Sequence, residues 1–106
     1  MGSGPVKRVK KARELAAALA SKGFRAREGD HTLYFLHAGG RKTSVRTKIS
    51  HGAEEYGPGL LSQMSKQLHL RSHELDDFVE CPLSHRGYLE LLVQRGTLPA
   101  EVLDTQ

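Results

Sequence analysis

Residues 5–22 place apolar side chains every three or four positions, which is the spacing of one helix face. Pro5 suits the first position of a helix, and Gly23 suits the cap after its last turn. The spacing therefore predicts a helix from about Pro5 to Lys22. Its apolar stripe consists of Val9, Ala12, Ala16, Leu19 and Ala20. The opposite face carries Lys7, Lys10, Lys11 and Glu14.

Residues 24–49 change to a two-residue alternation, which predicts three short β-strands. The strands are expected at 24–27, 31–37 and 42–49, with glycine-containing turns at 28–30 and 38–41. Successive side chains of a strand point to opposite faces, so the third strand has an apolar face and a cationic face. The first face holds Thr43, Val45, Thr47 and Ile49, and the second holds Ser44, Arg46 and Lys48.

The middle strand is compatible with two phases. In one phase Leu33 and Phe35 enter the core, and His31, which lies in phase with them, must still reach solvent from a twisted strand end. In the other phase Tyr34 and Leu36 are buried instead. The aromatic and branched residues of this segment favour a strand in either case.

A second helix is predicted from Pro58 to about Leu70, after a polar loop at 50–57. Its apolar stripe consists of Leu60, Leu61, Met64 and Leu68. The first two-thirds of the chain thus have the order α-β-β-β-α. We expect an α+β fold in which both helices cover one face of a three-stranded antiparallel sheet and leave the other face open.

The last third predicts one or two additional C-terminal helices within residues 71–96. A short helix follows Ser72 and ends at Pro82, and Ser84 caps a second one that ends before Gly96. We expect these helices to pack on the 6–70 body or against another copy of the chain, because their apolar residues need cover. Those residues are Leu75, Phe78, Leu91 and Leu92. Residues 97–106 are expected to form a frayed tail.

The charge of the chain is divided unevenly along its length. The 106 residues suit one domain, and their net charge is +4. Residues 1–48 hold twelve Lys/Arg and three acidic residues, a net +9, whereas residues 49–106 hold four and nine, a net −5. A basic segment of this density attracts a phosphate backbone, so nucleic acid is the expected partner.

Several classes of protein are disfavoured by what the sequence lacks. There is no run of 18 apolar residues, so we expect no membrane-spanning helix, and the start has no apolar secretory segment. Cys81 is the single cysteine, so no disulfide forms within the chain. No metal site or cofactor is expected, and a cytoplasmic location is inferred. Residues 1–5 are interpreted as a flexible terminus or an expression scar.

Short motifs in the basic part resemble the HicA-type mRNA-interferase toxins over about residues 6–70. Gly23-Phe24 follows the first helix, and Gly29-Asp30-His31 opens the second strand, where that family has Gly-Ser-His. Pro58-Gly59 precedes a helix with the family's apolar pattern. The resemblance implies a double-stranded-RNA-binding-like fold and a metal-independent endoribonuclease that cleaves mRNA. It also implies a HicB-like antitoxin as a partner, within a toxin–antitoxin system.

The resemblance maps the family's catalytic histidine onto His31. Two departures affect this assignment: Asp30 replaces the usual serine, and residues 71–106 extend beyond the short members of the family. The carboxylate of Asp30 either repels phosphate or orients the His31 ring. The extension either covers the site, binds a partner or marks a different activity.

Cleavage of RNA by its own 2′-hydroxyl needs a base, cations on the phosphate and an acid for the leaving oxygen. Histidine suits the base because it exchanges protons near neutral pH, and Arg or Lys stabilise the phosphate charge. We therefore expect His31 as the base, with Arg46 and Lys48 as the main RNA contacts. Lys10 and Lys42 are second-tier contacts. The alternative for Arg46 and Lys48 is a solvated strand face without a ligand.

Two other functions remain open from the sequence. One is a non-catalytic RNA- or DNA-binding module on the same fold. The other is an interaction protein that recruits a partner through its acidic C-terminal half. His51 is a further candidate for the acid, since it follows the third strand.

Overall fold

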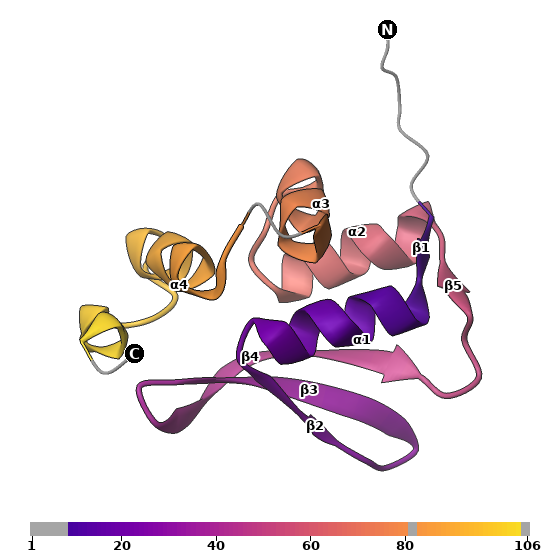
Figure 1. Cartoon of the computed structure of the whole chain (residues 1–106), viewed down its shortest axis with the longest axis horizontal. Helices are drawn as coiled ribbons and strands as arrows, with labels where there is room; N and C mark the ends of the chain where they lie inside the picture. Colours follow the sequence, from indigo (N-terminus) through magenta and orange to yellow (C-terminus); the bar gives the residue numbers. More distant parts are fainter. Residues whose placement is uncertain (1–8, 81–82, 105–106) are drawn as a thin grey trace, which may run out of the picture.

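The computed structural model describes residues 9–80 and 83–104, and a three-stranded antiparallel sheet forms one outer layer of it, below the helices in Figure 1. The strands are β2 (Phe24–Arg27), β3 (His31–Ala38) and β4 (Arg41–Ser50), in the order β2-β3-β4. All three were predicted, and only their ends differ, by one residue. Gly39 and Gly40 both have positive φ in the turn between β3 and β4, a conformation that glycine adopts at little cost.

The structure selects the second of the two phases for β3. Tyr34, Leu36 and Ala38 are buried, whereas Leu33 and Phe35 are only half-buried on the opposite face. Val45, Thr47 and Ile49 of β4 are buried on the same side as Tyr34 and Leu36. The phase that buries Leu33 and Phe35 is therefore wrong.

Two helices cover the buried face of the sheet, namely α1 (Ala12–Ser21) and α2 (Pro58–Gln67) (Figure 1). They bring Leu15, Leu19, Leu61 and Met64 into one core with the inward side chains of the strands. The arrangement is α+β in the predicted order, with both helices on one side. Among the described residues, no helix lies on the other side of the sheet (Figure 1).

The first helix begins later than its pattern predicts, at Ala12 instead of Pro5. Lys10–Lys11 form a short strand, β1, that pairs antiparallel with β5 (Glu55–Tyr56). This pairing supplies backbone hydrogen bonds that compete with the helix, and buried Tyr56 anchors it. Residues 5–8 lie outside the described residues. Val9 is therefore not part of the helical stripe and is exposed.

The apolar stripe of α2 is also narrower than predicted. Leu61, Met64 and Leu68 are buried, but Leu60 is 49% exposed. Residues at i, i+3 and i+7 share one helix face, and Leu60 precedes that face by one position. Its burial was thus wrongly predicted.

The C-terminal third packs on the same core through α3 (Ser72–Glu80) and α4 (His85–Gln94). An aromatic cluster joins them to the sheet, because Phe78 and Tyr88 both contact Phe24, with ring centroids 6.2 and 6.0 Å away. The Tyr88 hydroxyl donates a hydrogen bond to the Leu68 carbonyl at 3.0 Å. As predicted, the Ser84 hydroxyl caps α4, accepting from the Gly87 N–H.

The stretch after α4 is packed where fraying was expected. A 3₁₀ helix, η1, spans Ala100–Leu103, and both Leu98 and Val102 are buried. Leu75, Phe78 and Leu92 are buried within the chain as well, so a second copy is not needed to cover them. Cys81 and Pro82 lie outside the described residues.

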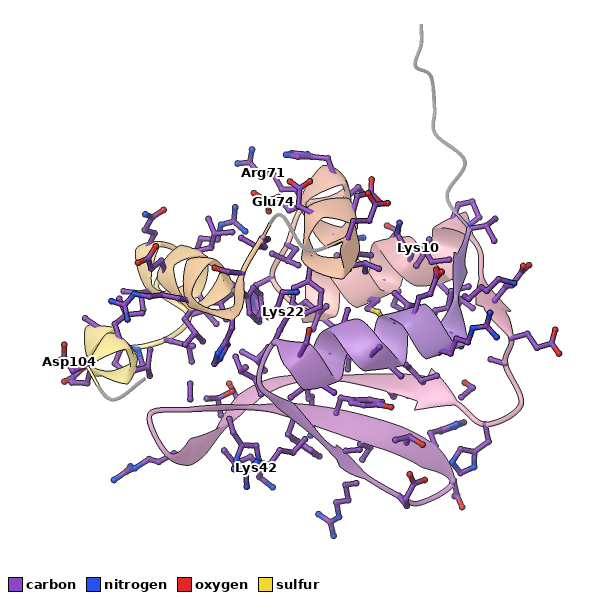
Figure 2. The ribbon with its side chains drawn as sticks, viewed as in Figure 1. Lys10, Lys22, Lys42, Arg71, Glu74 and Asp104 are labelled. Carbon is purple, nitrogen blue, oxygen red and sulfur yellow. The ribbon has the colours of Figure 1, made fainter. Side chains whose placement is uncertain are left out.

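A buried cation helps to hold α3 against α1. Lys22 is 4% exposed, and its Nζ donates to the Phe78 carbonyl at 3.0 Å and lies 5.4 Å from the Phe78 ring centroid (Figure 2). A second link joins α3 to the end of α4, where Arg95 pairs with Glu74 at 2.7 Å. This contact lowers the pKa of Glu74 to about 2, chiefly through the hydrogen bond from Arg95.

The packing of α4 generates a prediction about Gly23. Its φ is +93°, and an added Cβ would lie 2.7 Å from His85 Nε2, so Gly23→Ala is both strained and crowded. We expect this variant to lose more than about 1 kcal/mol of unfolding free energy, measured by urea denaturation. Gly40→Ala is the matched control, since Gly40 also has positive φ but its Cβ would meet nothing within 4 Å. Equal midpoints for the two variants would contradict the contact with His85.

Candidate nucleic-acid interface

The face of the sheet opposite α1 and α2 gathers the candidate functional residues, and we call it the open face. Its members come from all three strands because adjacent strands in register direct paired side chains to the same side. They are Arg25, Arg27, His31, Leu33, Phe35, His37, Lys42, Arg46 and Lys48. No carboxylate stands among these positions.

Cations flank apolar side chains in two rows across the open face. Phe35 pairs with Arg25 of β2 on one side and Arg46 of β4 on the other. One pleat further along, Leu33 pairs in the same way with Arg27 and Lys48. Because the central strand supplies the apolar residues, each row has charge at both ends and an apolar centre.

Phe35 already contacts a cation. The Nζ of Lys42 lies 4.5 Å from the centroid of its ring, within the range of a cation–π interaction. Phe35 is half-buried, so part of the ring is accessible. An aromatic ring in a cationic surface can stack on a nucleic-acid base.

His31 lies exposed at the start of β3, opposite Ser50 of β4. Within the part of the chain that the structure describes, no side chain hydrogen-bonds to its imidazole. Glu28 in the preceding turn is engaged elsewhere: it accepts from Thr32 Oγ1 at 3.1 Å and lies 3.4 Å from His51 Nε2. His51, the candidate acid, is thus associated with a carboxylate instead of standing alone.

The other histidine of the open face, His37, is held in a positive field. Desolvation lowers its pKa most, and the charges of Arg25 and Lys42 lower it further. The ring is therefore predominantly neutral at pH 7. Lys42 is also the residue of β4 that pairs with His37.

Three of the four predicted RNA contacts, Arg46, Lys48 and Lys42, share the open face with His31, but Lys10 does not. Its Nζ lies 3.1 Å from Asp76 Oδ1 and 3.6 Å from Glu80 Oε2, and its side chain is 13% exposed. Figure 2 shows Lys10 on the helix side of the sheet and Lys42 on the opposite side. The pairing with α3 gives Lys10 a structural role instead.

The sequence reasoning missed Arg25, Arg27 and Phe35 as members of this surface. The alternation Arg-Ala-Arg in residues 25–27 was a signal for the two arginines, because it places both on one face of the strand. Tyr34, the neighbouring aromatic residue, is 9% exposed and faces the core. Phe35, one residue further, is the aromatic residue of the open face.

The described residues of the C-terminal extension do not cover the open face. Helices α3 and α4 lie on the helix side of the sheet and beside its end (Figure 1). Among the described residues, no three His, Cys, Asp or Glu side chains are grouped as metal ligands would be. The same residues include no helix of the length and apolarity needed to cross a membrane.

No protein-family model, curated protein or solved structure matches this chain. The resemblance to the HicA-type toxins therefore rests on the short motifs of residues 6–70 alone.

The field around His37 is testable by titration. Removing a nearby positive charge stabilises the imidazolium, so Arg25→Gln and Lys42→Met should each raise the pKa of His37. The measurement is the pH dependence of the imidazole Cε1 proton by NMR. Lys66→Gln on α2, on the other side of the sheet, is the control and should leave the titration unchanged. A pKa unmoved by both face variants would show that the charges are too far away.

Proposed function

We propose that this protein binds single-stranded RNA along the open face and cleaves it with His31 as the general base. The observation that carries the proposal is the open face itself. Five cations surround Phe35 and Leu33 there, and none of the open-face positions holds a carboxylate. Such a surface offers charge to the phosphates and an apolar centre to the bases.

The mixture of charge and apolar surface favours a single strand over a duplex. In a duplex the bases are stacked on each other, so Phe35 would have no base to contact. A single strand can place its bases on Phe35 and Leu33 while its phosphates reach the arginines and lysines of β2 and β4. Lys42 then exchanges the ring of Phe35 for a phosphate oxygen.

His31 supplies the chemistry in this proposal. Its imidazole accepts the proton of a 2′-hydroxyl, and the 2′-oxygen attacks the adjacent phosphorus as the bond to the 5′-oxygen breaks. The products are a 2′,3′-cyclic phosphate and a 5′-hydroxyl, with the leaving oxygen protonated by water or by His51. Arg46 and Lys48 stabilise the charge that develops on the phosphate.

The family resemblance supports the same activity, and with it an mRNA target and a HicB-like antitoxin that covers the open face. A non-catalytic RNA-binding module is the second candidate, favoured by Asp30 beside His31. The acidic C-terminal half gives less support to a partner-recruiting role. Several of its carboxylates are paired within the chain, Glu74 with Arg95 and Asp76 with Lys10.

The binding proposal predicts a salt-dependent affinity for a short, labelled, single-stranded RNA, measured by fluorescence anisotropy. Arg46→Gln and Lys48→Gln should each weaken binding and reduce the slope of log K against log salt by about 0.7 per lost phosphate contact. Lys66→Gln is the control for net charge and should change neither. Salt-insensitive binding, or equal loss with all three variants, would contradict the open face as the interface.

Phe35→Leu completes the binding test because it keeps the apolar centre but removes the ring. Loss of a stacked base costs about 1–3 kcal/mol, so the variant should bind the single strand at least several-fold less tightly. Binding to a duplex of the same sequence should be weak in both proteins. A duplex preference would overturn the choice of a single strand.

The cleavage proposal predicts that His31→Ala loses RNA cleavage by about 100-fold or more, since a general base contributes about 10²–10⁴-fold. The assay separates products from end-labelled RNA on a gel in the presence of EDTA. The same variant should retain RNA affinity, which shows that it is folded. Cleavage that persists in His31→Ala would show that His31 is not the general base. A wild-type protein that binds RNA without cleaving it would favour the second candidate, the non-catalytic RNA-binding module.

A further inference from the structure

A hollow of about 370 Å³ lies at the end of the sheet opposite His31. It is formed where the end of α1, the first residues of β2, the end of β3, the β3–β4 turn and α4 meet. The side chains with hydrogen-bonding capacity in its wall are Arg25, His37 and His85. The described residues that line it include no Asp or Glu.

The composition of this hollow suits an anion. Arg25 carries a permanent charge and a planar set of donors that fits phosphate oxygens. His37 is adjacent on the next strand, since its N–H donates to the Gly23 carbonyl at 3.0 Å, two pairs before Arg25 in the β2–β3 ladder. Its neutral ring still has an N–H that can donate to a phosphate oxygen. Lys42, which pairs with His37 across β3 and β4, adds a second positive charge beside the site.

One wall of the hollow is supplied by α4, which belongs to the C-terminal extension. The His85 ring lies against Gly23, where an added Cβ would meet its Nε2 at 2.7 Å. This nitrogen is buried and has no hydrogen-bond partner within the described structure. His85 therefore shapes this wall of the hollow, while the accessible donors are those of Arg25 and His37.

We propose that this hollow binds the terminal phosphomonoester of an RNA strand that lies on the open face. A monoester carries more negative charge than an internal diester, and it suits a site that has Arg25 and His37 in its wall and Lys42 beside it at one end of the surface. The diesters along the strand occupy the two cation rows instead. The inference rests on the proposed function because it assigns one end of the same RNA.

The position of the hollow also fixes how far the bound terminal phosphate lies from His31. His31 and His37 are six positions apart on β3, which separates them by about 20 Å at about 3.3 Å per residue. An RNA held by its terminal phosphate at His37 would therefore meet His31 at a fixed distance from that end. Cleavage should release a short product of uniform length, counted from the phosphorylated end.

The test compares one single-stranded RNA sequence prepared with a 5′-phosphate, with a 3′-phosphate or with hydroxyls at both ends. For wild-type protein we expect one of the phosphorylated forms to bind at least about tenfold more tightly than the hydroxyl form, which corresponds to about 1.4 kcal/mol. The end whose phosphate increases the affinity identifies the polarity of the bound strand. His37→Gln should abolish the increment, whereas Arg46→Gln should weaken all three RNAs alike and preserve it.

Equal affinity of all three RNAs for the wild-type protein would overturn the inference while leaving RNA binding on the open face intact. A gain in affinity from the terminal phosphate that survives in both His37→Gln and Arg25→Gln would also overturn the inference, because it would place the phosphate elsewhere. If no RNA binds, the proposed function fails first. The hollow is then tested by titrating a nucleoside monophosphate against the His37 NMR signal, and an unmoved signal would overturn it.

Discussion

The phase of β3 is the constraint on which the rest of this molecule depends. Side chains of a strand alternate, so burying Tyr34 and Leu36 under the two helices forces His31 and Phe35 outward. A slip of one residue would exchange these two sets and place a histidine in the core. The hydrogen-bonded register then carries the choice to both neighbours, because it places Arg25 and Arg46 beside Phe35. The apolar core and the cationic surface are thus two results of one alternation.

The C-terminal extension completes the core without obstructing that surface. Its aromatic residues contact Phe24 from the helix side, and Lys22 joins the ends of α1 and α3 through the Phe78 carbonyl. A buried ammonium is tolerated because a helix C-terminus provides carbonyl oxygens and partial negative charge. The extension also introduces His85 at the end of the sheet. Of the three roles expected for this segment, covering the site is the one that the placement of α3 and α4 contradicts (Figure 1).

The predictable part of the fold was the part governed by local pattern. The three strands and the cap at Ser84 follow from alternation and turn residues, which act over a few positions. The start of α1 was missed because Lys10 and Lys11 pair with residues 55–56, more than forty positions away. The phase of β3 could not be chosen from the strand alone, since both of its faces carry apolar residues and the helices decide which face is buried. Arg46 and Lys48 were predicted on the correct face because only one face of β4 is apolar. The placement of Phe35 stayed open between the two phases of β3.

The division of charge along the chain becomes in part a division in space. The five cations of the open face, on β2 and β4, point away from the helices, while Asp76, Glu80 and Glu74 lie on α3, on the far side of the sheet. These three carboxylates are paired with Lys10 and Arg95, whereas no carboxylate stands among the positions of the open face. If a polyanion is the ligand, as we propose, the positive field of the strands would draw it toward this side before contact, and the association rate would fall as salt shortens the range of the field.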